Sequence, residues 1–275
     1  MNMLTDKIKR LLLVGFLFLA GCHTNEPARL QLEQARNLYE NAQYGSAKQT
    51  LDELKTNFPK AYEVQKEAIH LMREIEVKEQ ERNLVFCDSL LFVRQAEVDS
   101  MKSYFVFEKT EYDANGRYVD KSWNPAISSG DNFIKTSVNE LNEIALTAVY
   151  KGAAIQYDRL KVSVSSGEYA ETQAIPFDGG ANYAFKDGAG ITYQIVTFQK
   201  GRDNGVIPFI YNYSQEKITM EYEGGKKVSP RIISGNEKLS LVRTVDFTAI
   251  LKDIDQLKQE KDKAGKRIEY LQSKL

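Results

Sequence analysis

FTAILKDIDQLKQEKDKAGKRIEYLQSKL, residues 247–275, is the stretch that decides the fold of this 275-residue chain. Its apolar positions recur at alternating intervals of three and four residues, which is the spacing of a heptad seam. One lysine interrupts the seam, which consists of Phe247, Ile250, Ile254, Leu257, Lys261, Ala264, Ile268, Leu271 and Leu275. Because such a seam needs a second helix to cover it, we expect a coiled-coil-type helix over residues 245–275.

A partner for this helix is present earlier in the chain. Residues 60–103 contain no proline or glycine and carry a broken apolar stripe made of Leu71, Ile75, Leu84, Cys87, Leu91, Val98 and Met101. The simplest arrangement is an antiparallel pair in which the C-terminal helix packs back on this long helix. The alternative is that the seam pairs with another copy of the chain, which would give a homo-oligomer.

The region between the two helices, residues 104–244, has the pattern of an antiparallel β domain. Turn sequences at Asp113–Gly116, Lys186–Gly190 and Arg202–Gly205 separate short alternating runs. One face of each run is apolar, as in Ile144, Leu146 and Ala148; Leu160, Val162 and Val164; Ile191, Tyr193 and Ile195; and Ile218, Met220 and Tyr222. We therefore predict an α+β fold whose head is a β-sandwich or partly open barrel of eight to ten strands.

Residues 28–103 begin with a helical hairpin that leads into the long helix. Ala35, Leu38, Ala42, Tyr44, Ala47, Leu51, Leu54 and Pro59 fall at spacings that resemble those of a tetratricopeptide repeat. The resemblance implies two antiparallel helices brought close by the alanines, with Pro59 ending the second helix. A generic helical pair is the alternative. Because a single repeat cannot bury its open face alone, another part of the chain or a partner must cover it.

The first 21 residues have the features of an export signal. Lys7, Lys9 and Arg10 precede a short apolar run, and Leu19-Ala20-Gly21-Cys22 resembles the lipobox of bacterial lipoproteins. The resemblance implies cleavage after residue 21, acylation of Cys22 and a lipidated tether over residues 22–27 that anchors the chain to a membrane. Residues 23–26 lack the aspartate that resembles an inner-membrane retention signal of enteric bacteria, so we expect the outer membrane. They also lack the dense acidic cluster that marks surface export in some lipoproteins, so we expect the protein to face the periplasm.

Composition narrows the class of function. The formal net charge is −1 for the whole chain and close to −3 without the signal, so we expect no nucleic-acid partner. The chain has two histidines, His23 and His70, and we expect no metal, cofactor or enzymatic activity. The carboxylates that a glycosidase would need are available as Glu168, Glu171, Asp178, Asp187 and Asp203, but their sequence context is typical of exposed turns.

Aromatic and amide side chains beside turns are the best candidates for ligand or partner contacts. They are Tyr118, Trp123, Phe133, Asn182, Tyr183 and Phe185. We expect a lipid-anchored scaffold or protein-interaction module with an envelope protein as partner; a glycan- or peptidoglycan-binding lipoprotein that uses the β domain is the alternative. Asp-Ser-aliphatic triplets at Ser89 and Ser100 also resemble O-glycosylation signals of bacterial envelope proteins.

Overall fold

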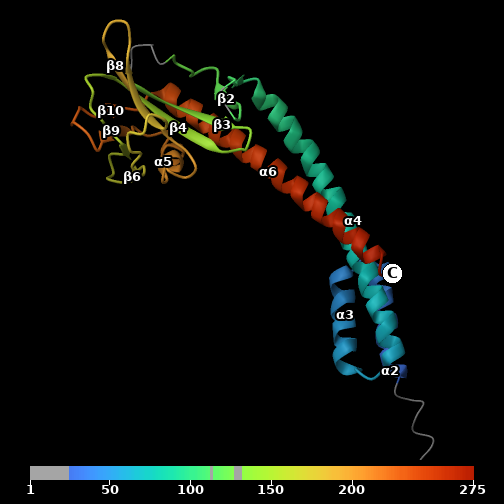
Figure 1. Ribbon diagram of the computed structural model, residues 1–275. Coiled ribbons are helices and arrows are strands. Elements are labelled where there is room, and N and C mark those ends of the chain that lie inside the picture. The colour runs from blue at the N-terminus through green and yellow to red at the C-terminus, as the bar shows by residue number, and fades with distance from the viewer. Residues whose placement is uncertain (1–24, 112–113, 127–131) are drawn as a thin grey trace, which may run out of the picture. The chain divides into compact units, whose positions relative to one another are not determined.

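The computed structural model describes residues 25–111, 114–126 and 132–275, so the expected lipidation site Cys22 and the lipobox lie outside the described residues. The fold is α+β, as predicted, with an N-terminal helical hairpin, a long helix, two antiparallel sheets and a long C-terminal helix (Figure 1). The helices are α2 (Glu26–Glu40), α3 (Tyr44–Asn57), α4 (Tyr62–Lys102), α5 (Val206–Asn212) and α6 (Gly235–Gln272).

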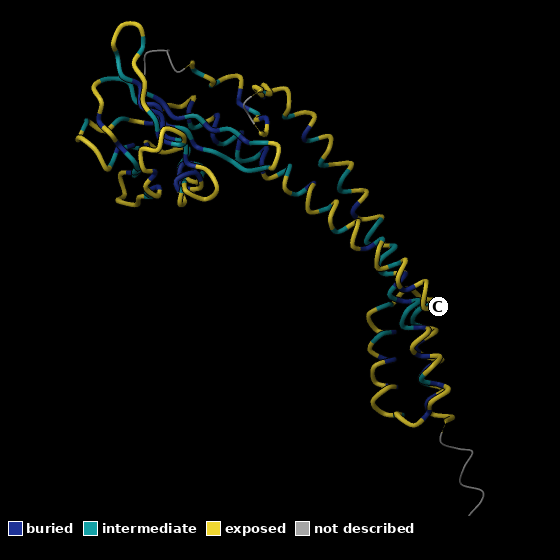
Figure 2. The backbone as a smooth tube through the Cα atoms, viewed as in Figure 1, coloured by how far each residue is buried: buried dark blue, intermediate teal, exposed yellow. Residues whose placement is uncertain are grey.

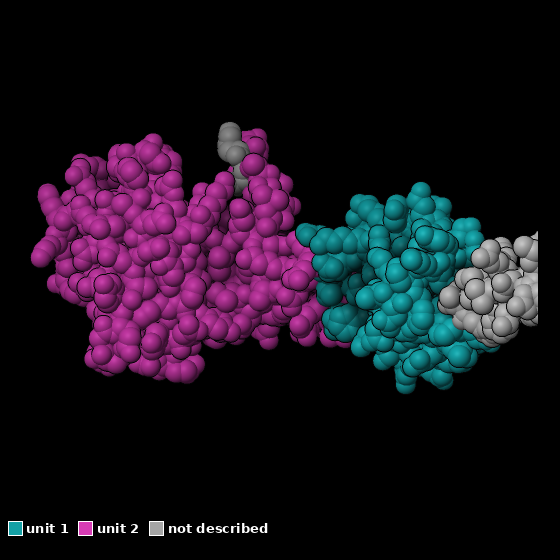
Figure 3. All heavy atoms as spheres, turned by 90° about the horizontal axis from the view of Figure 1, so that it is seen from below, with its two compact units in different colours: residues 1–90, 257–275 teal, residues 91–256 magenta. Residues whose placement is uncertain are grey.

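Contacts between residues divide the chain into two compact units (Figure 3). Among the described residues, unit 1 comprises residues 25–90 and 257–275, and unit 2 comprises those between 91 and 256. Helices α4 and α6 contribute to both units, and each unit has a hydrophobic core of its own.

The core of unit 1 forms between α2, α3 and the first turns of α4. Ala35 and Ala47 are fully buried, which lets α2 and α3 approach closely, and α3 ends two residues before Pro59, as predicted. Ala42 does not lie in this interface, contrary to prediction, because it sits in the turn between the helices with φ of 57°. The buried core residues are Ala28, Leu32, Ala35, Ala47, Leu51, Leu54, Ala61, Val64, Ala68, Leu71 and Ile75.

The C-terminal helix α6 packs on α4 of the same chain, which confirms the first of the two alternatives for the heptad seam. In unit 1, Ala264 and Leu271 of the seam are buried. The lysine within the seam, Lys261, forms an ion pair with Asp88 of α4, with 2.5 Å between Lys261 Nζ and Asp88 Oδ1. In unit 2, the seam residues Phe247 and Ile254 of α6 share a hydrophobic cluster with Val98 of α4.

Ten strands in the described part of unit 2 form two sheets, all of whose pairings are antiparallel. The six-stranded sheet, called sheet A here, has the order β1-β2-β3-β4-β8-β7, and the four-stranded sheet B has the order β10-β9-β5-β6. The strands are β1 (Phe105–Glu108), β2 (Arg117–Asp120), β3 (Phe133–Asn139), β4 (Ile144–Gly152), β5 (Arg159–Ser163), β6 (Tyr169–Glu171), β7 (Asn182–Lys186), β8 (Thr192–Phe198), β9 (Thr219–Glu223) and β10 (Arg231–Ile232).

The main core of unit 2 lies between the two sheets and includes α5 (Figure 2). Leu146 and Ala148 of sheet A and Leu160 and Val162 of sheet B belong to one buried cluster, so the alternation predicted for these runs is confirmed. We call the face of sheet A that contributes to this core its inner face and the opposite face its outer face.

Helix α6 covers the β1–β3 part of the inner face. Phe247 stacks on Phe105 with 4.6 Å between ring centroids and meets Tyr118 edge-on at 5.5 Å, while Thr136 Oγ1 donates to Thr244 Oγ1 at 3.1 Å. The helix begins at Gly235 rather than at residue 245. The reason is a capping box in which Ser234 and Glu237 exchange hydrogen bonds with each other's backbone amides.

Two details of the β region differ from the sequence-based expectation. Strand β8 is buried on both faces, because Tyr193 and Ile195 pack outward while Val196 and Phe198 pack into the core. The turn at Arg202–Gly205 leads into helix α5 rather than a strand. The helical spacing of the four apolar residues that follow explains this outcome, since Val206, Ile207, Phe209 and Ile210 are all buried on one side of a short helix.

Candidate functional site

The six candidate contact residues do not form one site, because they lie on opposite faces of sheet A. Tyr118 and Asn182 are on the inner face. Tyr118 packs on α6, and Asn182 is buried, where its Nδ2 donates to Ile175 O at 2.7 Å and to Tyr157 O at 3.2 Å. Both side chains therefore contribute to packing on the inner face.

The other four candidates gather on the outer face. Phe133 is buried beneath Trp123, with 6.5 Å between ring centroids, and Tyr183 packs against the same cluster. Phe185 is 40% exposed and stacks on Tyr193 at 5.2 Å with an interplanar angle of 12°. Only the tips of this aromatic cluster therefore reach solvent, and Phe185 offers the most accessible ring.

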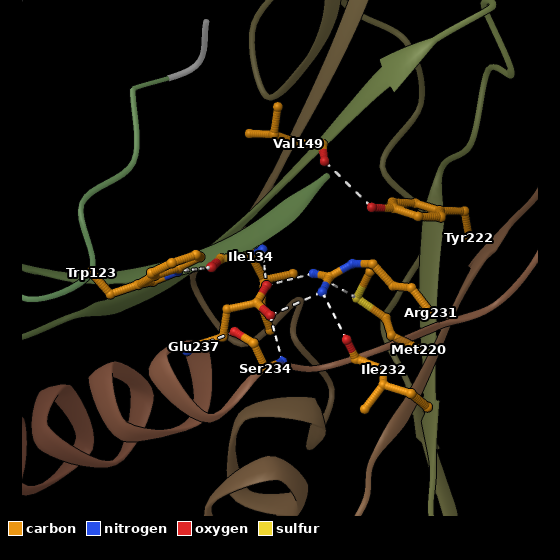
Figure 4. Close-up of polar contacts among 9 residues, drawn as sticks. All are labelled: Trp123, Ile134, Val149, Met220, Tyr222, Arg231, Ile232, Ser234 and Glu237. Carbon is orange, nitrogen blue, oxygen red and sulfur yellow. Dashed lines mark hydrogen bonds and ion pairs between the residues drawn. The ribbon is translucent and has the colours of Figure 1, made fainter. Parts of the chain in front are cut away.

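The indole of Trp123 also contacts a cluster of buried polar groups (Figure 4). Trp123 Nε1 donates to Ile134 O at 2.9 Å, and Ile134 N donates to Glu237 Oε1 at 2.8 Å. The side chain of Glu237 is 2% exposed. Its carboxylate accepts hydrogen bonds from Arg231 Nη2 at 2.6 Å and from Arg231 Nη1 at 2.9 Å. This cluster joins sheet A, sheet B and the start of α6, which indicates a structural role.

Unit 1 contains a groove that the sequence analysis did not identify. It has a volume of about 360 Å³ and lies among α3, α4 and the end of α6. We call it the helical groove. It is lined by Leu51, Asp52, Lys55, Gln65, Ala68, Ile69, Met72, Arg73, Glu76, Arg267, Tyr270 and Leu271.

The helical groove has an apolar floor and a charged rim. Leu51, Ala68 and Leu271 are buried beneath it, whereas Ile69 and Tyr270 on its walls are 52% and 54% exposed. These two side chains are large, apolar and accessible, and both line the same groove. A surface of this kind is typical of protein-interaction sites.

Some charged side chains on the rim of the helical groove have ion-pair or hydrogen-bond partners within the protein, and others do not. Arg267 forms an ion pair with Glu76 and also lies over the ring of Tyr270, 5.5 Å from its centroid. Arg73 Nη1 donates to Lys274 O at 2.6 Å. Among the described residues, Lys55 has no hydrogen-bond or ion-pair partner and is free to meet an incoming group. Two sequence features could have predicted this groove. They are the heptad seam of the C-terminal helix and the uncovered face of the helical hairpin.

The carboxylates considered for glycosidase chemistry are engaged in turns and ion pairs. Asp178 accepts hydrogen bonds from the amides of Asn182 and Gly180, and these bonds lower its pKa. Amides of Ile191 and Ala189 likewise lower the pKa of Asp187. A general acid needs a raised pKa, so the shift of both groups is opposite to the one that such a role requires.

The described residues also bear on metal binding and on membrane-spanning helices. No group of three or more histidine, cysteine, aspartate or glutamate side chains in residues 25–111, 114–126 and 132–275 is placed to hold a metal ion. Within the same ranges, none of the helices is both long and apolar enough to cross a bilayer.

No protein-family model, no curated protein and no solved structure matches this chain.

Proposed function

We propose that this protein is a lipid-anchored envelope scaffold that binds another envelope protein through the helical groove of unit 1. The exposed pair Ile69 and Tyr270 above an apolar floor is the observation that supports this function most directly. Apolar anchors surrounded by a polar rim are the arrangement in which most of the binding energy of protein interfaces is concentrated.

The helical groove is of a size to hold individual side chains of a partner protein. A volume of about 360 Å³ accommodates one or two large apolar side chains of a partner. Burial of each such side chain contributes roughly 1.5–3 kcal/mol, so two anchors supply about 3–6 kcal/mol, and contacts around the rim must supply the rest of the affinity.

The proposed anchor would hold the start of α2 near a membrane surface. Four peptide units separate Cys22 from Glu26, the first residue of α2, and an extended chain of that length reaches about 14 Å. Acylation of Cys22 would therefore keep the start of unit 1 within a short distance of the lipid. The sequence features that support the anchor are the apolar export signal and the lipobox.

A crosslinking experiment in cells tests the groove. The native lipidated protein would be crosslinked, purified under denaturing conditions and compared with a double variant, Ile69→Glu and Tyr270→Glu. Leu30→Glu is the matched control, because Leu30 is an exposed apolar residue of unit 1 that does not line the groove. We expect crosslinked envelope proteins to be lost from the double variant and kept by the control; an unchanged set in the double variant would contradict the proposal.

The anchor has a separate test. Cys22→Ala removes the thiol that takes the lipid, so the protein should move from the detergent phase to the aqueous phase in a detergent-partition assay. Wild-type protein that already partitions into the aqueous phase would contradict the proposed lipidation, whatever the result for the groove.

The outer face of sheet A favours a second candidate function, glycan or peptidoglycan binding. The stacked pair Phe185 and Tyr193, with Trp123 and Tyr183 beside it, resembles a platform on which a sugar ring can lie. Retention of the protein on isolated peptidoglycan, reduced by Phe185→Ala but not by Ile69→Glu, would favour this function over the scaffold.

A further inference from the structure

A second groove lies on the outer face of sheet A, away from the aromatic cluster. It has a volume of about 320 Å³ and is lined by residues in or beside β2, β3, β4 and β8. We call it the polar groove. It is lined by Asn115, Arg117, Ser137, Asn139, Leu141, Glu143, Ile144, Ala145, Thr147, Thr197, Gln199 and Lys200.

Hydroxyl groups line the floor of the polar groove. Thr147 of β4 lies opposite Thr197 of β8, with 3.2 Å between their Oγ1 atoms, and Ser137 of β3 lies opposite Ala145 of β4. Strands β3, β4 and β8 are paired on both sides, so their backbone groups are already used by the sheet. A ligand must therefore be recognised by side-chain hydroxyl and amide groups, which excludes addition of a peptide strand here.

Two cations, Arg117 and Lys200, and one anion, Glu143, line the polar groove. Glu143 Oε2 accepts a hydrogen bond from Asn139 Nδ2 at 3.0 Å. Lys200 has no ion-pair or hydrogen-bond partner among the described residues. Arg117 uses Nε for Glu108 at 3.3 Å, which leaves both of its Nη groups available. Arg117 lies in β2 and Lys200 follows β8, and three strand intervals, or about 14 Å, separate these two strands.

The wall formed by the β3–β4 turn is held in place before any ligand arrives. Asn139 Oδ1 accepts hydrogen bonds from the amides of Leu141 and Glu143, each at 2.9 Å. Asn142 Nδ2 donates to Asp255 Oδ2 of α6 at 2.6 Å, so the turn is tied to the helix behind it. A preformed wall lowers the entropic cost of binding.

We propose that the polar groove binds an acidic saccharide, a carbohydrate whose rings carry carboxylates. The hydroxyl and amide floor matches the hydroxyl groups of a sugar, and the cations at its two sides match carboxylates about three strand spacings apart. This site is separate from the helical groove and does not depend on the protein partner proposed for it. It also differs from the aromatic platform, because it uses none of the four aromatic residues there.

Isothermal titration calorimetry of the full lipidated protein in detergent micelles tests the inference. The probes are hexagalacturonate, which is carboxylated, and maltohexaose, which is neutral. We expect binding of hexagalacturonate that weakens as salt is raised and at least tenfold weaker binding of maltohexaose. Absence of hexagalacturonate binding at millimolar concentration, or equal affinity for the two probes, would overturn the inference.

Three double variants assign the binding to the groove. Arg117→Ala with Lys200→Ala should reduce the affinity at least tenfold and remove most of the salt dependence. Thr147→Val with Thr197→Val should reduce the affinity several-fold and keep the salt dependence, because the shape stays the same and only hydroxyls are lost. Lys226→Ala with Lys227→Ala removes two lysines outside the groove and should change neither; wild-type affinity in the first variant, with an unchanged thermal unfolding midpoint, would overturn the inference.

Discussion

Arg231 and Glu237 form a two-point ion pair in the interior of unit 2, with 2.6 Å from Arg231 Nη2 to Glu237 Oε1 and 2.9 Å from Arg231 Nη1 to Glu237 Oε2. The pair ties the last strand of sheet B to the first turn of α6. The same carboxylate accepts the amides of Ile134 and Ser234, so four donors converge on Glu237. The stability of the contact between the two sheets and α6 therefore depends on this one side chain.

Removal of the charge of Glu237 should destabilise the protein strongly. Glu237→Gln leaves the buried Arg231 guanidinium without its counter-charge, and breaking a buried pair in this way costs about 3–5 kcal/mol. Urea unfolding followed by circular dichroism measures the loss. Glu260→Gln, which removes an exposed pair with Lys263 on the same helix, should cost less than about 0.5 kcal/mol. Similar losses for the two variants would show that the buried pair is not stabilising.

The aromatic contact between α6 and sheet A should contribute strongly to stability. Phe247→Ala removes a fully buried ring that contacts Phe105 and Tyr118, and we expect a loss of about 3–5 kcal/mol in the free energy of unfolding. Phe92→Ala is the matched control, because Phe92 is a phenylalanine of α4 that is 80% exposed. That control should change the free energy of unfolding by about 0.5 kcal/mol or less.

The buried tyrosines predict a loss of stability at alkaline pH. Burial raises the pKa of Tyr222 to about 12, whereas a tyrosine in the unfolded chain titrates near pH 10. Between these values the unfolded chain releases a proton that the folded chain keeps, so the free energy of unfolding falls as the pH rises. Tyr222 should account for about 2–3 kcal/mol of this loss by pH 12.

Urea unfolding at pH 8, 10 and 11 measures this effect. Tyr222→Phe should make the pH dependence shallower, although burial also raises the pKa of Tyr157 and part of the slope will remain. Tyr62→Phe alters a tyrosine of unit 1 that is 74% exposed and should keep the wild-type slope. An identical slope in Tyr222→Phe and wild type would contradict the assignment.

The turn between α2 and α3 can be stabilised by a single change. Ala42 adopts φ of 57°, a left-handed conformation that costs an L-residue about 1 kcal/mol but costs glycine nothing. Ala42→Gly should therefore raise the free energy of unfolding by about 0.5–1 kcal/mol. Ala35→Gly, within the buried part of α2, should lower it by about 1 kcal/mol. A destabilising Ala42→Gly would mean that the turn changes conformation in solution.

Local sequence patterns were sufficient to locate the helices and strands in which apolar residues recur at regular spacing. The spacing from Phe247 to Leu271 predicted α6 and its packing on α4, and the alternation around Leu146 and Leu160 predicted the buried faces of two strands. These predictions succeed because helical and strand periods are properties of the local backbone. Helix α5 and the early start of α6 were missed, although Val206–Ile210 and the capping box at Ser234 carried usable signals.

Only the tertiary structure could show which residues from distant segments lie together. Tyr183 lies on the outer face and its neighbour Asn182 on the inner face, and period-2 alternation cannot tell which of the two will be covered by α5 and sheet B. The helical groove is lined by both Ile69 and Tyr270, which are some 200 residues apart in the chain. The polar groove likewise joins Arg117 to Lys200. The proximity of such distant residues depends on how whole helices and strands pack, and the free energy of that packing depends on all their contacts at once. A periodic run of apolar residues, in contrast, depends only on the residues within it.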